Sequence, residues 1–248
     1  MIVTPPVGLA DRHNAPAPRY TSYPPANRWS RKFGARALAK HLAIADHSQR
    51  ALSLYVHLPF CEPMCRFCEC NVIATRDRGR ADGYLDTLAL EIELWAAQLA
   101  TRRRVSQLHL GGGTPTFLSA AQLLRLFALL VERFPIVDGA DLAIEADPAV
   151  TDAEQLEVLA QLGFRRISIG VQDLDPGVQE AVGRLQTAEQ TERAIRSARV
   201  AGFTSVNVDL MYGLPFQTPE RFLHTVERII AMRPNRRRLR ARHIRRRC

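Results

Sequence analysis

Four cysteines within ten residues are the feature of this sequence best suited to chemistry. They are Cys61, Cys65, Cys68 and Cys70, in the segment YVHLPFCEPMCRFCECN. The spacing CxxxCxxCxC follows neither the period of a helix nor that of a strand, so packing on one face does not explain it. Thiolates this close together usually hold a soft metal or an iron–sulfur cluster. Three thiolates at CxxxCxxC can hold one cubane cluster and leave its fourth iron open to a ligand.

Two other uses of clustered cysteines compete with this interpretation. A disulfide framework is disfavoured because the one further cysteine is Cys248, and because the opening MIVTPPVGLA lacks the pattern of a secretory signal. We therefore expect a cytoplasmic, reducing setting and, without a long apolar run, no membrane partner. A structural zinc site is the stronger competitor, but zinc usually draws two ligand pairs from separate places, and a second pair is missing.

Composition indicates a globular α/β body with a basic end. The 248 residues are 46% hydrophobic and 24% charged, which suits one α/β domain or barrel. The net charge of +9 comes entirely from residues 232–248, which hold nine arginines and no acidic residue; the rest has 25 basic and 25 acidic side chains. A nucleic-acid partner is therefore not expected.

Apolar segments that alternate with amphipathic ones predict a parallel sheet with helical crossovers. Ser119 and Thr151 are predicted N-caps, and Gly163 and Gly202 are predicted helix ends. The predicted strands are Ser53–Leu58, Gln107–Leu110, Asp141–Ala146, Arg166–Val171 and Ser205–Met211; the predicted helices are Asp82–Ala100, Ala120–Phe134, Asp152–Leu162, Thr187–Ala201 and Pro219–Met232.

Polar residues follow each predicted strand, where the active sites of α/β barrels lie. The cysteine segment follows the first strand and Gly111–Thr116 follows the second. The ends of the other three carry Glu145 and Asp147, Gln172 and Asp173, and Asp209. Taken singly, each has a structural alternative. The glycines can form a tight turn, Glu145 can cap a helix and Arg184 can be a solvated arginine. His57 can be a satisfied core histidine or a proton donor, and we expect the first. Asp209, on an apolar strand, requires a partner.

Several motifs together resemble one enzyme family. YVHLPFCEPMCRFCECN, HLGGGTPTFLS, IEADP, RISIGVQDLD, NVDLMYGLPFQT and the early PRYTSYPP (Pro18–Pro25) are similar to segments of oxygen-independent coproporphyrinogen III oxidases, which are radical S-adenosylmethionine (SAM) enzymes. The resemblance runs from about Ala17 to Pro234. One departure is Glu69, where the family commonly has glycine.

The resemblance implies a partial (β/α) barrel and a specific reaction. Cys61, Cys65 and Cys68 would ligate a [4Fe–4S] cluster, and SAM would bind its open iron. A 5′-deoxyadenosyl radical would then start the oxidative decarboxylation of coproporphyrinogen III to protoporphyrinogen IX in haem synthesis. A flavodoxin or ferredoxin is expected as electron donor.

The resemblance also assigns residues to two bound SAM molecules. Cys70 matches a fourth cysteine that is not a cluster ligand, and its role stays open. Tyr55, Gly112 and Glu145 match positions that hold the cluster-bound SAM, whereas Phe67, Gly113, Thr114, Gln172, Arg184 and Asp209 match positions for a second SAM.

Beyond Pro234 the resemblance stops. We expect an N-terminal extension over residues 1–50, a partial barrel of about five βα units over 51–232, and a disordered or out-of-frame arginine-rich segment over 233–248. Truncation or a frameshift would remove the last unit and a C-terminal helical domain, and the chain as written is then expected not to turn over substrate. Only two of the 34 basic residues are lysines, Lys32 and Lys40, which suits GC-rich coding DNA read out of frame.

Two other functions stay open. A haem-carrying paralogue would keep the cluster, but such relatives generally lack the fourth cysteine and the PRYTSYP segment. A zinc-stabilised nucleic-acid-binding module would use the basic end. Metal content separates them, because a cubane gives about four iron and four sulfide per chain whereas the module gives one zinc.

Overall fold

The computed structural model describes residues 8, 28, 30, 33–48 and 50–241, and the PRYTSYPP segment lies outside this range. The chain divides into two compact units, residues 1–43 and 44–248. Helix α2 (Ala35–Asp46) is the main described element of the first unit, and its last turn belongs to the second. No described helix has the length and apolar character needed to cross a membrane.

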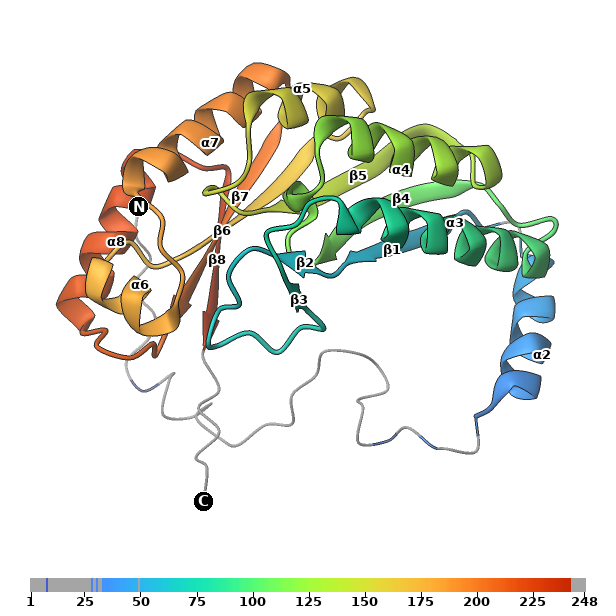
Figure 1. Cartoon of the computed structure of the whole chain (residues 1–248), viewed down its shortest axis with the longest axis horizontal. Coiled ribbons are helices and arrows are strands. Elements are labelled where there is room, and N and C mark those ends of the chain that lie inside the picture. Colours follow the sequence, from blue (N-terminus) through green and yellow to red (C-terminus); the bar gives the residue numbers. More distant parts are fainter. Residues whose placement is uncertain (1–7, 9–27, 29, 31–32, 49, 242–248) are drawn as a thin grey trace. The chain divides into compact units, whose positions relative to one another are not determined.

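The second unit is built on a six-stranded, wholly parallel sheet in the order β1-β4-β5-β6-β7-β8 (Figure 1). This arrangement confirms the predicted α/β class and the parallel crossovers. The strands are β1 (Leu52–Leu58), β4 (Val105–Gly112), β5 (Ile136–Ala146), β6 (Arg166–Gln172), β7 (Ser205–Tyr212) and β8 (Arg236–Ala241).

Helices α3, α4, α5 and α7 lie together on one side of this sheet (Figure 1). Apolar strand residues such as Leu108 and Val208 are buried, and the residues that alternate with them, such as His109 and Asn207, are polar. The side opposite the helices is therefore free to present polar groups. The helices are α3 (Arg80–Gln98), α4 (Ala120–Arg133), α5 (Ala153–Gln161), α6 (Pro176–Val182), α7 (Ala188–Ala201) and α8 (Pro219–Ala231), with a short 3₁₀ helix η2 (Pro115–Phe117).

Three of the four predicted helix boundary residues are confirmed. Ser119 caps α4 in a reciprocal capping box, Gly202 ends α7 at a φ of 110°, and Gly163 follows α5 at a φ of 95°. The prediction of Thr151 as an N-cap is wrong, because the side chain of Asp152 accepts a hydrogen bond from the Gln155 amide and caps α5. The Thr151 hydroxyl instead donates to the carbonyl of Asp147.

The expectation of disorder after residue 232 is wrong for residues 236–241, which form the edge strand β8. Backbone hydrogen bonds to β7 need no apolar side chain, and all six β8 residues are exposed, so the arginines stay solvated. Asn235 fixes the start of the strand: its amide donates to the carbonyl of Val206, and its side chain accepts the Val206 amide, both at 2.9 Å. Residues 242–248 lie outside the described residues.

Candidate functional site

The cysteine segment forms a loop between β1 and α3, held by backbone hydrogen bonds at both sides. Its two-residue strand β2 (Phe60–Cys61) pairs with β3 (Ile73–Ala74), which closes the loop. The amide of Thr114 donates to the carbonyl of Phe60 at 2.7 Å, and the amide of Arg66 donates to that of Val182 at 2.9 Å. The loop therefore spans from the end of β4 to the end of α6.

The three thiols assigned to the cluster have different surroundings. Cys61 shares a 3.2 Å hydrogen bond with the Thr114 hydroxyl, yet burial raises the pKa of its thiol. Cys65 is buried, and a guanidinium nitrogen of Arg184 lies 3.5 Å from its sulfur. A hydrogen bond from the exposed Cys70 lowers the pKa of Cys68 to about 6, and the same interaction raises the pKa of Cys70.

These thiols fit an iron–sulfur cluster better than a single ion. Among the described residues, no three His, Cys, Asp or Glu side chains converge closely enough to hold one metal ion. A cubane makes no such demand, because each of its cysteines binds a different iron. The sulfurs of Cys61, Cys65 and Cys68 are nevertheless close enough to interact electrostatically, and Arg184 supplies positive charge beside them.

The glycine segment at the end of β4 allows close approach rather than serving only as a turn. A Cβ at Gly113 would lie 2.7 and 2.8 Å from the carbonyl oxygens of Phe60 and Pro59. Gly112 has a φ of +118°, and a Cβ there would lie 2.9 Å from the ring of His57. Side chains at these positions would push the cysteine loop away from β4.

Glu145, near the end of β5, forms a polar group with His109, Tyr55 and the glycine segment. Its carboxylate lies 3.6 Å from the His109 ring nitrogen, and the Tyr55 and His109 rings are stacked. Burial alone would raise the pKa of Glu145, but His109, the Gly112 amide and Arg240 together lower it. Glu145 lies within β5, so it does not cap the next helix.

His57 has hydrogen-bond partners, as expected, but it does not lie in the core. Its Nε2 donates to the Asn71 carbonyl at 2.9 Å, and its Nδ1 lies 3.2 Å from the Tyr55 hydroxyl. It is only half-buried, and it joins the cysteine loop to the β1 end of the site.

Arg184 is a buried structural cation and not a solvated one. It forms a 2.9 Å ion pair with Asp147, with side chains only 12% and 10% exposed, and donates to the Gly170 carbonyl at 2.6 Å. Gln172 lies close by, and its backbone has a positive φ of 69°. Its side-chain amide oxygen, Oε1, is buried and has no hydrogen-bond partner among the described residues. That buried acceptor and the left-handed backbone at the end of β6 are consistent with a ligand site here.

Asp209 has the partners that its position requires. It accepts hydrogen bonds from Ser168 at 3.1 Å and Asn207 at 2.9 Å, and Arg240 lies 3.9 Å away. The expected need for a partner is thus met inside the sheet. Phe67 also has protein partners, because it packs against the buried cluster Val178, Val182 and Leu214.

His109 is a member of the site that was not predicted from the sequence, and Asp147 was predicted at this edge of the sheet but without its partner Arg184. His109 lies two residues before Gly111, on the polar side of β4, and alternation along that strand could have identified it. Asp147 was part of the quoted IEADP motif, but its pairing with Arg184 joins loops 37 residues apart in sequence. No local pattern reveals such a pair.

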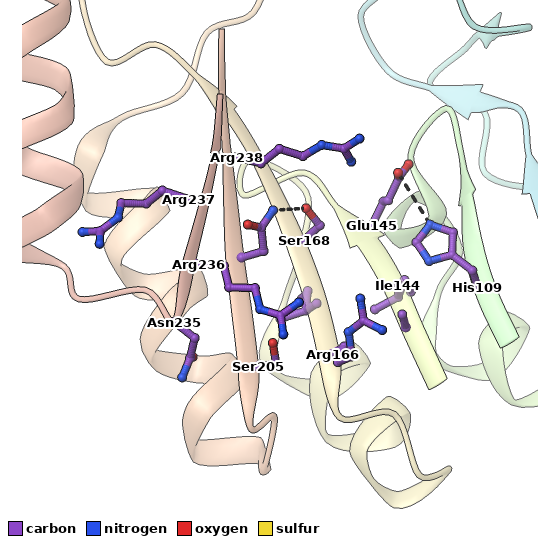
Figure 2. Close-up of a pocket in the computed structure, with 13 residues that line it drawn as sticks. His109, Ile144, Glu145, Arg166, Ser168, Ser205, Asn235, Arg236, Arg237 and Arg238 are labelled. Atoms are coloured by element: carbon purple, nitrogen blue, oxygen red, sulfur yellow. Dashed lines mark hydrogen bonds and ion pairs between the residues drawn. The ribbon is translucent and has the colours of Figure 1, made fainter. Parts of the chain in front are cut away.

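A cavity of about 660 Å³ extends over the polar side of the sheet from β4 to β8 (Figure 2). Figure 2 shows Glu145 and His109 at one end and the arginines of β8 at the other. Its lining consists of His109, Ala143, Ile144, Glu145, Arg166, Ile167, Ser168, Ser205, Asn207, Asn235, Arg236, Arg237 and Arg238.

Comparisons with known proteins agree with this geometry. Residues 55–229 match the family model of the radical SAM superfamily. The oxygen-independent coproporphyrinogen III oxidases of Escherichia coli and Pseudomonas aeruginosa are 47% and 44% identical over 93% and 92% of this chain. The chain spans 50% of each of these relatives.

A solved structure agrees as well. That of coproporphyrinogen III oxidase from Escherichia coli, a radical SAM enzyme, superposes with a TM-score of 0.85 at 46% identity, over 90% of this chain and 51% of that one. The resemblance inferred from the motifs is thereby confirmed.

Proposed function

This chain belongs to the radical SAM superfamily, and from that premise we propose that it supplies the cluster- and SAM-binding part of an oxygen-independent coproporphyrinogen III oxidase. The observation that supports this most is the convergence of Cys61, Cys65 and Cys68 with Arg184 and the glycine segment at one edge of the sheet. Once bound, the cluster supplies the electron that cleaves SAM.

Each thiol of the loop has a distinct task in this proposal. Cys61, Cys65 and Cys68 bind three irons of a [4Fe–4S] cluster. Arg184 holds positive charge beside Cys65, where it would offset negative charge of a bound cluster. Cys70 is exposed and interacts with Cys68, and it stands outside the ligand set because it matches the fourth cysteine of the family, which is not a cluster ligand.

SAM would lie between the cysteine loop and β5. Glu145 is kept ionised and can accept from an ammonium or hydroxyl group, and the glycines let a ligand approach the backbone. Tyr55, 57% exposed, presents its ring beside them. A second SAM would draw on Phe67, Thr114, Gln172 and Asp209, although here Phe67 packs in the core and Asp209 is hydrogen-bonded within the sheet.

The test is an anaerobic assay with SAM, coproporphyrinogen III and dithionite in place of the protein electron donor. We expect 5′-deoxyadenosine but no decarboxylated porphyrin, because the chain as written is expected not to turn over substrate; both products are measured by liquid chromatography and mass spectrometry. Cys65→Ser should form neither, and Cys70→Ser should retain SAM cleavage. Porphyrin product from the wild-type chain would contradict the expected loss of turnover. Equal SAM cleavage by Cys65→Ser would overturn the proposal.

A further inference from the structure

Strand β8 places three arginines on the polar side of the sheet. Arg236, Arg238 and Arg240 alternate along the strand, and the first two are in register with Asn207 and Asp209 of β7. Figure 2 shows Arg236 and Arg238 extending from β8 over the cavity, on the side of Ser168, whereas Arg237 extends from the other side of the strand. Two guanidinium groups therefore line one end of the cavity.

Within the described part of the chain, these two charges are not neutralised. Neither Arg236 nor Arg238 has an ion-pair partner there, whereas Arg240 lies 3.9 Å from Asp209. Of the other charged lining groups, Arg166 contacts Asp141 and Glu145 faces His109, whereas Arg237 extends from the other side of β8. The β8 end of the cavity therefore carries net positive charge.

The spacing of the pair suits a ligand with more than one anionic group. Alternate residues of a strand lie about 6.6 Å apart, so the two positive charges on β8 repel each other. Bound anions would neutralise the charges and remove this repulsion. A guanidinium presents a planar fork that binds carboxylates through two parallel hydrogen bonds. The Ser168 and Asn207 side chains between the two ends are already bonded to Asp209, so Arg236 and Arg238 are charged donors that no described side chain occupies.

We propose that Arg236 and Arg238 form a binding site for carboxylate groups of a polycarboxylate ligand that lies in this cavity. The inference rests on the proposed function, because coproporphyrinogen III carries propionate side chains of this kind. A ligand anchored at β8 would extend along the sheet toward Glu145 on β5, about 14 Å away at three strand spacings. Its far end would then reach the glycine segment and the cysteine loop, while unreacted carboxylates stay on the arginines.

The test is the binding of coproporphyrin III, the oxidised and unreactive form of the substrate, followed by its fluorescence. The cluster-loaded chain is titrated anaerobically without SAM, so that no chemistry takes place. Arg236→Gln with Arg238→Gln should weaken binding by about tenfold for each arginine removed. Replacing both by lysine keeps the charge but loses the fork, and should weaken binding less than glutamine does.

A charge-matched control separates a site from a net-charge effect. Arg193 and Arg196 are exposed on α7, which lies on the helical side of the sheet. Changing both to glutamine removes the same charge and should leave affinity within about twofold. Circular dichroism checks that all variants are folded.

Equal weakening in both double variants, unchanged binding after the β8 substitutions, or no binding by the wild-type chain would each overturn the inference. Because the titration contains no SAM, a failure of SAM cleavage would count against the proposed function alone.

Discussion

At the residue scale, Arg184 connects three parts of the site. Its guanidinium contacts Asp147 after β5, the carbonyl of Gly170 in β6 and the sulfur of Cys65. Burial would lower the pKa of Arg184, but Asp147 and Cys65 raise it, so the charge is maintained. A buried cation held in this way positions the thiol and the end of β6 at the same time.

Replacing Arg184 with glutamine is expected to lower the free energy of unfolding by about 3 kcal/mol, because Asp147 is left as an unpaired buried charge. Urea unfolding of the cluster-free chain measures this. Asp147→Asn added to the same variant should restore part of the loss, through a coupling of about 1–3 kcal/mol. Purely additive effects would show that the two side chains do not stabilise each other.

Glu145 gives a pH-dependent prediction. Its pKa is lowered, so the interactions of its carboxylate stabilise the fold above the ordinary carboxyl pKa and are lost as pH falls through the lowered value. The cluster-free wild type should therefore have a higher Tm than Glu145→Gln from about pH 5 upward, and this advantage should vanish in more acidic buffer. A Tm difference that persists unchanged at low pH would contradict the assignment.

At the element scale, the contact between β4 and the cysteine loop depends on glycine. Gly113→Ala would place a Cβ against two backbone carbonyls that cannot rotate away, so we expect a loss of about 2 kcal/mol and a lower iron content after reconstitution. Gly83→Ala is the matched control, because no atom lies within 4 Å of the added Cβ and alanine favours a helix. Equal iron loss in both variants would argue against a specific contact.

The docking of β8 on β7 depends on Asn235. Asn235→Ala removes the acceptor for the Val206 amide, which should cost about 1 kcal/mol and fray the start of β8. Hydrogen–deuterium exchange should then quicken in residues 236–241 and leave β4 and β5 unchanged. Unaltered exchange in β8 would show that the strand is held by other contacts.

The strands of the sheet could be predicted to within a few residues because each is a short run of buried Val, Ile and Leu, except at the start of β5, where the apolar pattern begins late. Strand β8 could not be predicted from the sequence. Its six residues include four arginines and are all exposed, so its pairing comes from backbone groups and from Asn235, which no periodicity reports. Helix α6 was missed because seven residues carry too little periodicity.

At the scale of the whole molecule, charge is distributed unevenly. The body is neutral and the excess of arginine lies beyond residue 232, but β8 returns part of that excess to the polar side of the sheet. The gathering of polar residues at one edge of the sheet was predicted from topology alone, since parallel strands all end at the same edge. The pairings among them, such as Arg184 with Asp147, depend on tertiary contacts and follow only from the structure.

The central claim is that Cys61, Cys65 and Cys68 hold a cluster with an iron open to SAM. The most direct measurement is electron paramagnetic resonance of the reconstituted, reduced chain before and after SAM is added, together with iron and sulfide analysis. We expect about four iron and four sulfide per chain and a signal that SAM alters in the wild type and in Cys70→Ser. A single bound zinc, or an iron signal that SAM leaves unchanged, would contradict the claim.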